Sequence, residues 1–260
     1  MKLVAVDMDG TFLNDQMDYD RTKFAQLHQK MQDQDVRFVV ASGNQYYQLK
    51  SFFEDYPDVI YVAENGAYIR DLDQEYVVAH FSLETVQAIL QELSAFQQLQ
   101  IIVCGRHSAY VLNAEPQEYV DQMRKYYYKL KRVGSFEALD DDILKFALSC
   151  PPQQTDELVK QLRVALNGMA IPVSSGHGDI DLIQPGINKA AGLKQLGERL
   201  NIPMTEMVAF GDGGNDQEML AEVGTGVAMS NAAPAVKEVA DVMTDSNNDQ
   251  GVLTYLDKRL

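Results

Sequence analysis

Three short apolar runs near the start of the chain place the strongest constraint on its fold. Residues 3–6, 36–41 and 59–63 are each bounded by polar residues or glycine, as expected of buried parallel strands. The segments 20–34 and 44–54 between them are long enough and suitably periodic for helices. This βαβαβ alternation predicts an α/β fold with a doubly wound parallel sheet that helices cover.

The alternation stops after Glu64. The turn dipeptide Asn65-Gly66 precedes an expected hairpin, and an α+β region follows with helices from 83, from 116 and over 155–167. Its expected strands are 101–105, 109–113, 145–150, 170–175 and 179–183. The α/β rhythm then returns with helices at 189–200 and 216–222 and from 234 and 251, and with strands 207–211 and 226–229.

This order predicts one core domain interrupted by one insertion. We expect residues 1–82 and 187–260 to form the core, and residues 83–186 to form a separate α+β lobe. A chain of 260 residues is long enough for both.

Charge and cysteine usage limit the partners and the compartment. The net charge of −16 repels nucleic acid and anionic lipid, so we expect neither as a partner. The same charge repels a phosphorylated substrate, so a phosphate site would need local support from a metal ion, a lysine or a helix N-terminus. Two cysteines without metal-ligand spacing favour a reducing compartment. No apolar segment is long enough for export or for a membrane span, so we expect a cytoplasmic protein.

Asp7 and Asp9 follow the first apolar run in the order D-M-D-G-T. Because side chains alternate along an extended chain, the two carboxylates point the same way and Met8 points away. They lie at the carboxyl end of a strand, where open α/β sheets bind ligands. An isolated D-x-D is more often a pair of solvated aspartates, and a calcium loop is excluded because Phe12 and Asp18 replace its glycine and glutamate.

A second acidic motif, G-D-G-G-N-D at 211–216, also follows an expected strand. It brings Asp212 to the same edge of the sheet as Asp7 and Asp9. Three carboxylates at one edge suit a hard divalent cation, and Mg²⁺ is the expected ion because no cluster of histidines and cysteines could serve zinc.

Ser42, Gly43 and Lys189 are candidates for binding phosphate. Ser42 and Gly43 offer a hydroxyl and a backbone N–H between a strand and a helix. Lys189 begins a helix, where its charge opposes the helix dipole and gains nothing structurally. Each alone is more often a cap or a surface residue, but together they predict an anion site.

Six strings in this order resemble the haloacid dehalogenase superfamily, subclass IIB (Cof-type), over nearly the whole chain: D-M-D-G-T, A-S-G-N, E-N-G-A, N-K-A-A-G-L, G-D-G-G-N-D and G-V-A-M-S-N-A. Longer stretches at 41–49, 62–67 and 174–186 resemble the bacterial broad-specificity sugar phosphatases of that group. The resemblance implies a Rossmann-like core with an inserted C2B cap that selects substrates, and Mg²⁺-dependent hydrolysis of hexose and pentose phosphates through an aspartyl-phosphate.

The resemblance also implies roles for individual residues. Asp7 would be the nucleophile and a metal ligand, and Asp9 would be the general acid and base, with its backbone carbonyl on the metal. Asp212 would be the third protein ligand of the metal. The residues implied to hold or support the phosphate are Met8 (through its backbone), Thr11, Ser42, Gly43, Lys189 and Asn215. Weaker candidates are Asp216 beside the metal, and Asn44 and His177 on the substrate side.

Asn44 departs from the wider family, since many Cof-type members have arginine after the Ser/Thr-Gly pair. A bidentate guanidinium is therefore absent, which we interpret as a feature of substrate choice. The alternatives are a phosphatase of a phosphorylated cofactor such as FMN or pyridoxal phosphate, a phosphosugar mutase, and a binding protein without catalysis. The expected partner is a small phosphorylated molecule, and the expected state is a monomer or a small homo-oligomer.

Overall fold

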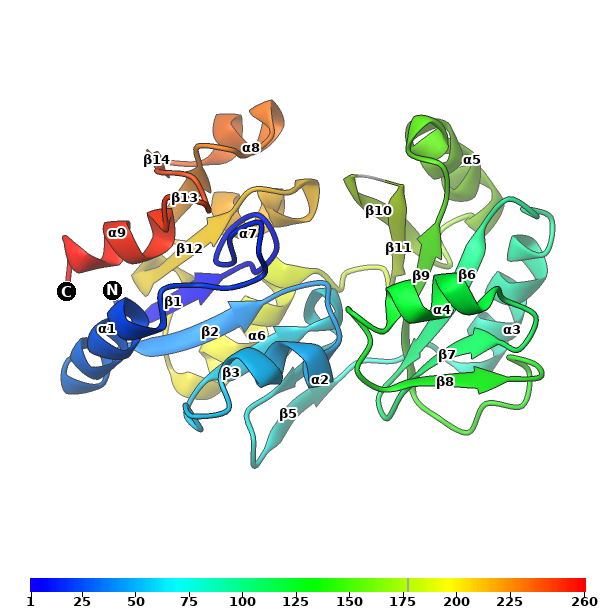
Figure 1. The fold of residues 1–260 in the computed structure, drawn as a ribbon, viewed down its shortest axis with the longest axis horizontal. Helices are drawn as coiled ribbons and strands as arrows, with labels where there is room; N and C mark the ends of the chain where they lie inside the picture. Colours follow the sequence, from blue (N-terminus) through cyan, green and yellow to red (C-terminus); the bar gives the residue numbers. More distant parts are fainter. Residues whose placement is uncertain (177) are drawn as a thin grey trace.

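The computed structural model describes residues 1–176 and 178–260, which form two lobes, each built around one β-sheet. Both chain termini lie in the lobe that holds the larger sheet (Figure 1). No helix in the described part of the chain is long and apolar enough to cross a membrane.

The larger sheet has eight strands in the order β14-β13-β12-β1-β2-β3-β4-β5. The strands from β14 to β3 are parallel, and β4 and β5 are an antiparallel addition at one edge. In chain order the strands are β1 (Leu3–Val6), β2 (Arg37–Ala41), β3 (Ile60–Ala63), β4 (Tyr68–Arg70), β5 (Glu75–Val78), β12 (Met207–Gly211), β13 (Thr225–Met229) and β14 (Val242–Thr244).

The chain leaves β1 toward β2 on one side and returns to β12 on the other. Strand order therefore reverses at β1, and the carboxyl ends of β2, β1 and β12 lie side by side. In open α/β sheets such a reversal leaves a crevice that binds ligands.

The smaller sheet has six strands in the order β10-β11-β9-β6-β7-β8, antiparallel except for the pair β7 and β8. Strands β10 and β11 lie on the side of this lobe that faces the larger sheet (Figure 1). The strands are β6 (Gln100–Gly105), β7 (Ala109–Leu112), β8 (Leu130–Val133), β9 (Ile143–Ser149), β10 (Ile171–Gly176) and β11 (Asp179–Ile183).

Some of the helices begin where a polar side chain caps the first turn. Asp20 accepts a hydrogen bond from the backbone of Lys23, and Asn188 accepts one from that of Ala191. The α-helices are α1 (Arg21–Asp33), α2 (Tyr46–Leu49), α3 (Leu83–Leu93), α4 (Gln117–Met123), α5 (Thr155–Leu166), α6 (Lys189–Leu200), α7 (Gln217–Glu222), α8 (Pro234–Val239) and α9 (Gly251–Asp257). The 3₁₀ turns are Lys50–Phe52, Glu64–Gly66, Pro152–Gln154, Met204–Glu206 and Gly214–Asp216.

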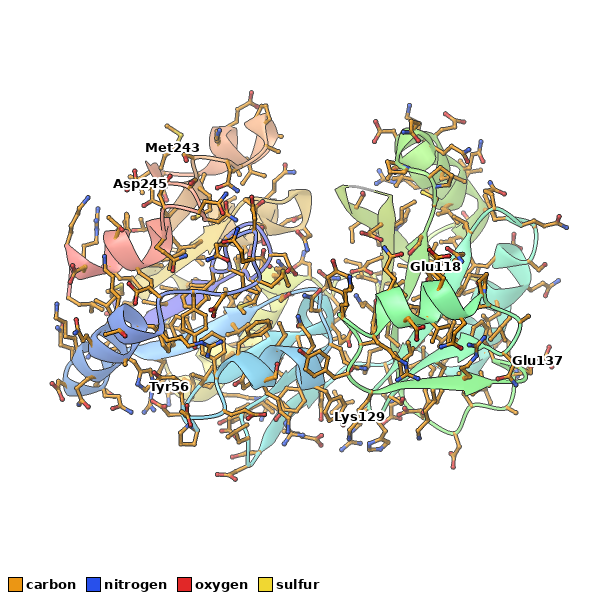
Figure 2. The ribbon with its side chains drawn as sticks, viewed as in Figure 1. Tyr56, Glu118, Lys129, Glu137, Met243 and Asp245 are labelled. Carbon is orange, nitrogen blue, oxygen red and sulfur yellow. The ribbon has the colours of Figure 1, made fainter. Side chains whose placement is uncertain are left out.

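Each sheet has its own apolar core. One cluster of buried side chains fills the larger lobe, and two others involve the strands and helices of the smaller one. Leu144 of β9 belongs to the cluster of the larger lobe, so the lobes also pack together. Figure 2 shows Lys129, just before β8, on the side of the smaller lobe near α2. Its backbone exchanges two hydrogen bonds of 2.9 Å with the side chain of Gln45.

The expected doubly wound α/β core with an inserted α+β lobe is confirmed, with three local differences. The helix expected over 44–54 is only α2 and one 3₁₀ turn, because the buried ring of Phe53 packs against Phe12 and Phe24 in an aromatic cluster. Strands β8 and β14 were not predicted. Both are short edge strands with polar or exposed residues, so pairing with a neighbour determines them more than sequence pattern does. The proposed boundaries at 82/83 and 186/187 stay a prediction.

Candidate active site

The expected nucleophile, Asp7, follows β1 at the reversal point of the larger sheet. The residue is buried at 7% exposure, and its backbone N–H donates to the Phe210 carbonyl at 3.1 Å. The next turn is tight, since the carbonyl of Met8 accepts from the backbone of Phe12 and of Leu13. Met8 itself is fully buried and anchors the turn. The chain therefore presents Asp7 from a rigid strand end.

A buried lysine joins two of the carboxylates. Lys189, the first residue of α6, places its Nζ 2.6 Å from Asp7 Oδ1 and 2.7 Å from Asp216 Oδ1. Burial alone would lower the pKa of Lys189, but Asp216 and Asp7 together raise it above its ordinary value. The lysine is therefore held protonated beside the nucleophile.

Asp212 completes an acidic cluster after β12. Oxygens of Asp7, Asp212 and Asp216 lie within 4.8 Å of one another. Thr11 Oγ1 donates to Asp212 Oδ1 at 2.7 Å, and Gly10 makes room for this contact, since a Cβ there would lie 2.4 Å from Asp212 Oδ2. Thr11 is thus seen to support a carboxylate, while its contact with phosphate stays a prediction.

The cluster suits a cation. Burial raises the pKa of Asp7 well above its ordinary value, Lys189 opposes this, and Asp216 and Asp212 raise it further. Burial also raises the pKa of Asp212 to about 6, although the hydrogen bond from Thr11 acts to lower this pKa. Three carboxylates against one ammonium leave two excess negative charges, which a divalent ion would neutralise.

Asp7 and Asp212 are the better-placed metal ligands. Asp216 is fully buried, and its Oδ2 already accepts the backbone N–H of Asp212 and of Gly213 while its Oδ1 holds Lys189. Its side chain therefore shapes the loop that carries Asp212. This arrangement fits the expectation that Asp216 belongs to the surroundings of the metal. Carboxylate oxygens are ligands that Mg²⁺ prefers.

Asp9 stands apart from this cluster, at the surface of the cleft. Asn44 Nδ2 donates to Asp9 Oδ2 at 2.6 Å. Desolvation in the cleft raises the pKa of Asp9, and the hydrogen bond from Asn44 opposes it. A raised pKa suits a carboxyl group that must carry a proton for part of a reaction. Asn44 therefore contacts the expected acid, and its contact with substrate stays a prediction.

The expected phosphate ligands surround the same crevice. Ser42 and Gly43 follow β2, and the Ser42 hydroxyl accepts the backbone N–H of Asn44 at 3.1 Å. Asn215 Nδ2 donates to Asn65 Oδ1 at 3.2 Å. Asn65, Lys189 and Asn215 also line one cavity between the lobes. His177 lies outside the described residues.

Sequence reasoning missed four residues that the structure brings to this edge. Glu64, Asn65, Lys145 and Asp181 meet beside Gly43, the last two from the smaller sheet. Two local signals were present: Glu64 and Asn65 lie in the string E-N-G-A, and Lys145 is a charged residue within a mostly apolar strand. Nothing in the sequence indicated what Lys145 would contact.

Comparisons with known proteins identify the family of the chain. A family model for haloacid dehalogenase-like hydrolases matches residues 4–256. The 5-amino-6-(5-phospho-D-ribitylamino)uracil phosphatase YbjI of Escherichia coli (strain K12) is 42% identical over 265 residues, covering 100% of this chain and 96% of that protein.

Solved structures agree as well. SMU.1108c from Streptococcus mutans UA159 is 33% identical with a TM-score of 0.94, covering 99% of this chain and 98% of that one. The subclass IIB sugar phosphatase BT4131 shares the fold, with a TM-score of 0.86 at 21% identity and coverage of 99% and 98%. The chain therefore belongs to the haloacid dehalogenase-like hydrolase family.

Proposed function

We propose that this chain is a Mg²⁺-dependent phosphatase of small sugar and sugar-alcohol phosphates that works through an aspartyl-phosphate on Asp7. The observation that carries the proposal is the buried contact between Asp7 and Lys189, beside Asp212, at the reversal point of the sheet. A carboxylate beside a fixed cation can approach a phosphoryl group that would otherwise repel it. The proposed cytoplasmic location and oligomeric state stay predictions.

In the proposed reaction, Asp7 Oδ attacks phosphorus, and the bond between phosphorus and the ester oxygen breaks. Asp9 gives its proton to the departing alkoxide, and the resulting carboxylate then takes a proton from the water that hydrolyses the aspartyl-phosphate. Ser42, Gly43, Lys189 and Asn215 hold the phosphate during both steps. Asp7, Asp212 and the Asp9 carbonyl would hold Mg²⁺, which would supply positive charge that offsets the carboxylates and the phosphate oxygens.

The substrate class rests on three observations. The stretches at 41–49 and 174–186 resemble sugar phosphatases. The 42% identical relative is named for a substrate whose phosphate sits on a ribityl chain attached to a pyrimidine. The cavity that contains Lys189 and Asn215 also has an apolar wall of Ile171, Val173 and Ile183, which offers a surface to a flat ring. The phosphorylated ribitylaminouracil is therefore the favoured individual substrate.

A panel of phosphate monoesters tests the substrate class. We expect kcat/KM for 5-amino-6-(5-phospho-D-ribitylamino)uracil, ribose 5-phosphate and hexose 6-phosphates to exceed that for 5′-AMP or a phosphopeptide by about 10-fold or more, because pocket contacts discriminate by about 1 to 3 kcal/mol each. Phosphate release under one set of conditions gives the ranking. Highest efficiency with FMN or pyridoxal phosphate would move the function to the cofactor phosphatase.

The role of Asp9 is tested by leaving groups of different acidity. We expect Asp9→Asn to lower kcat on a sugar phosphate by about 10²- to 10⁴-fold, because an alkoxide needs protonation as it departs. With p-nitrophenyl phosphate, whose phenolate leaves unprotonated, phosphorylation of Asp7 should survive better. Rapid-quench measurement of protein-bound phosphate separates this step from hydrolysis of the intermediate.

Asp15→Asn provides a matched control, since that exposed aspartate accepts hydrogen bonds from Asn247 and Asn248 and has no part in the proposed reaction. Equal losses with both substrates in Asp9→Asn would contradict its role as the acid. Normal turnover of a sugar phosphate would contradict its role altogether.

A further inference from the structure

A buried ionic cluster joins the smaller sheet to the loops expected to bind phosphate. Lys145 of β9 places its Nζ 2.8 Å from Asp181 of β11 and 3.5 Å from Glu64. The side chains of Lys145 and Glu64 are 3% and 2% exposed. We call Lys145, Asp181, Glu64 and Asn65 the Lys145 cluster.

One branch of the cluster leads to Ser42. Lys145 Nζ donates to the Gly43 carbonyl at 2.7 Å. That carbonyl shares a planar peptide with the N–H of Asn44, which donates to Ser42 Oγ at 3.1 Å. The ammonium group therefore fixes the peptide plane that orients the Ser42 hydroxyl.

A second branch leads to Asn215. Asp181 Oδ2 accepts from Asn65 Nδ2 at 2.6 Å, and Asn65 Oδ1 accepts from Asn215 Nδ2 at 3.2 Å. Asn65 has a left-handed backbone (φ 56°) between Glu64 (φ 51°) and Gly66 (φ 96°). Two successive non-glycine residues in that region need outside contacts to hold them, and the Lys145 cluster supplies these contacts.

Burial and energetics indicate what the cluster does. Lys145 Nζ donates to the Gly43 carbonyl and to Asp181 and pairs with Glu64, so protein groups take up its hydrogen-bonding capacity. A buried ion pair adds little net stability, because desolvation offsets the attraction between the charges. The contacts of the cluster also fix the positions of the two loops. A contribution to stability alone does not explain these contacts.

We propose that Lys145 and Asp181 are positioning residues for phosphoryl transfer: from the smaller lobe, they hold Ser42 and Asn215 in the geometry that the transition state requires. This inference rests on the proposed phosphatase function. According to this inference, the anion site is complete only when the two lobes are in contact.

Lys145→Met and Asp181→Asn test the inference. We expect each to lower kcat by about 10- to 100-fold, the size of effect that misplaced binding groups produce. The loss should be equal for p-nitrophenyl phosphate and for a sugar phosphate, because the anion loops serve both. Affinity for vanadate, which mimics the transition state, should fall in parallel with kcat. The Mg²⁺ concentration for half-maximal activity should stay the same, since Asp7 and Asp212 are untouched.

Arg106→Gln is the matched control. Arg106 of the smaller lobe pairs with Glu75 of the larger one, so it also joins the lobes, but among the described residues its guanidinium pairs with Glu75 and Asp142 and not with Ser42, Gly43 or Asn215. We expect its kcat and vanadate affinity to stay within about twofold of wild type, because exposed ion pairs contribute little.

The outcomes separate the inference from the proposed function. Wild-type kcat in both cluster variants, or a loss confined to the sugar phosphate, overturns the inference. A loss of the same size in Arg106→Gln assigns the effect to lobe contact in general and also overturns it. If Lys145→Met does not fold, the test relies on Asp181→Asn, because the asparagine side chain has nearly the same shape as that of aspartate. If wild type hydrolyses no phosphate ester, the proposed function fails, and calorimetric titration with vanadate still decides whether the cluster positions an anion site.

Discussion

Replacing Asp7 with asparagine is expected to abolish turnover and to leave no protein-bound phosphate. An amide is a poor nucleophile and a poor metal ligand, and removing a covalent nucleophile typically costs on the order of 10⁴- to 10⁶-fold in kcat. Acid quench during turnover of a ³²P-labelled sugar phosphate, followed by detection of labelled protein, measures the intermediate directly.

Stability measurements distinguish lost chemistry from lost folding in this variant. Burial raises the pKa of Asp7, so at neutral pH its ionised form costs folding free energy in the metal-free protein. Asp7→Asn removes that cost, and Lys189 keeps its pair with Asp216. We therefore expect a metal-free Tm at least equal to that of wild type. Asp33→Asn, an exposed change on α1, serves as the neutral control. Residual turnover with a labelled intermediate would contradict the assignment of Asp7.

Removal of Mg²⁺ is expected to reduce activity to the uncatalysed background. Without the ion, Asp7, Asp212 and Asp216 carry two more negative charges than Lys189 offsets, and they repel a phosphate dianion. Activity in EDTA, restored by excess Mg²⁺, measures the requirement. The Tm should rise with added Mg²⁺ in wild type, because an ion that binds only the folded state stabilises it, and should not rise in Asp7→Asn. Full turnover after exhaustive chelation would refute the metal site.

The Mg²⁺ requirement should also depend on pH. Burial raises the pKa of Asp212 to about 6, so Asp212 is mostly ionised at pH 7.5 and mostly protonated at pH 5. Metal binds the ionised form, and so protons compete with it increasingly as pH falls through about 6. The Mg²⁺ concentration for half-maximal activity should therefore rise at acid pH. A requirement that is constant from pH 7.5 to 5 would contradict this raised pKa.

Much of the core could be predicted because its signals are local. Apolar runs with polar ends marked β1, β2, β3 and β12, since a strand buried on both faces has few other possible sequences. The position of Asp7 and Asp212 after such strands was enough to place them at one edge, because parallel strands share that edge. The edge strands β8 and β14 gave no comparable signal, since their formation depends on a neighbour.

The sequence by itself determined the fold class, the inserted lobe and the set of acidic and phosphate-binding candidates, because strand periodicity and motif order follow from short-range chemistry. Only the tertiary structure decided which groups pair. It directed Thr11 to Asp212, Asn44 to Asp9 and Lys189 to both Asp7 and Asp216. It also brought Lys145 to Gly43 across 102 positions of the chain. The first three pairings depend on how the larger sheet brings distant loops to one edge, and the last depends on how the two lobes pack. The free energy of a buried charge depends on its partners, which no local stretch of sequence specifies.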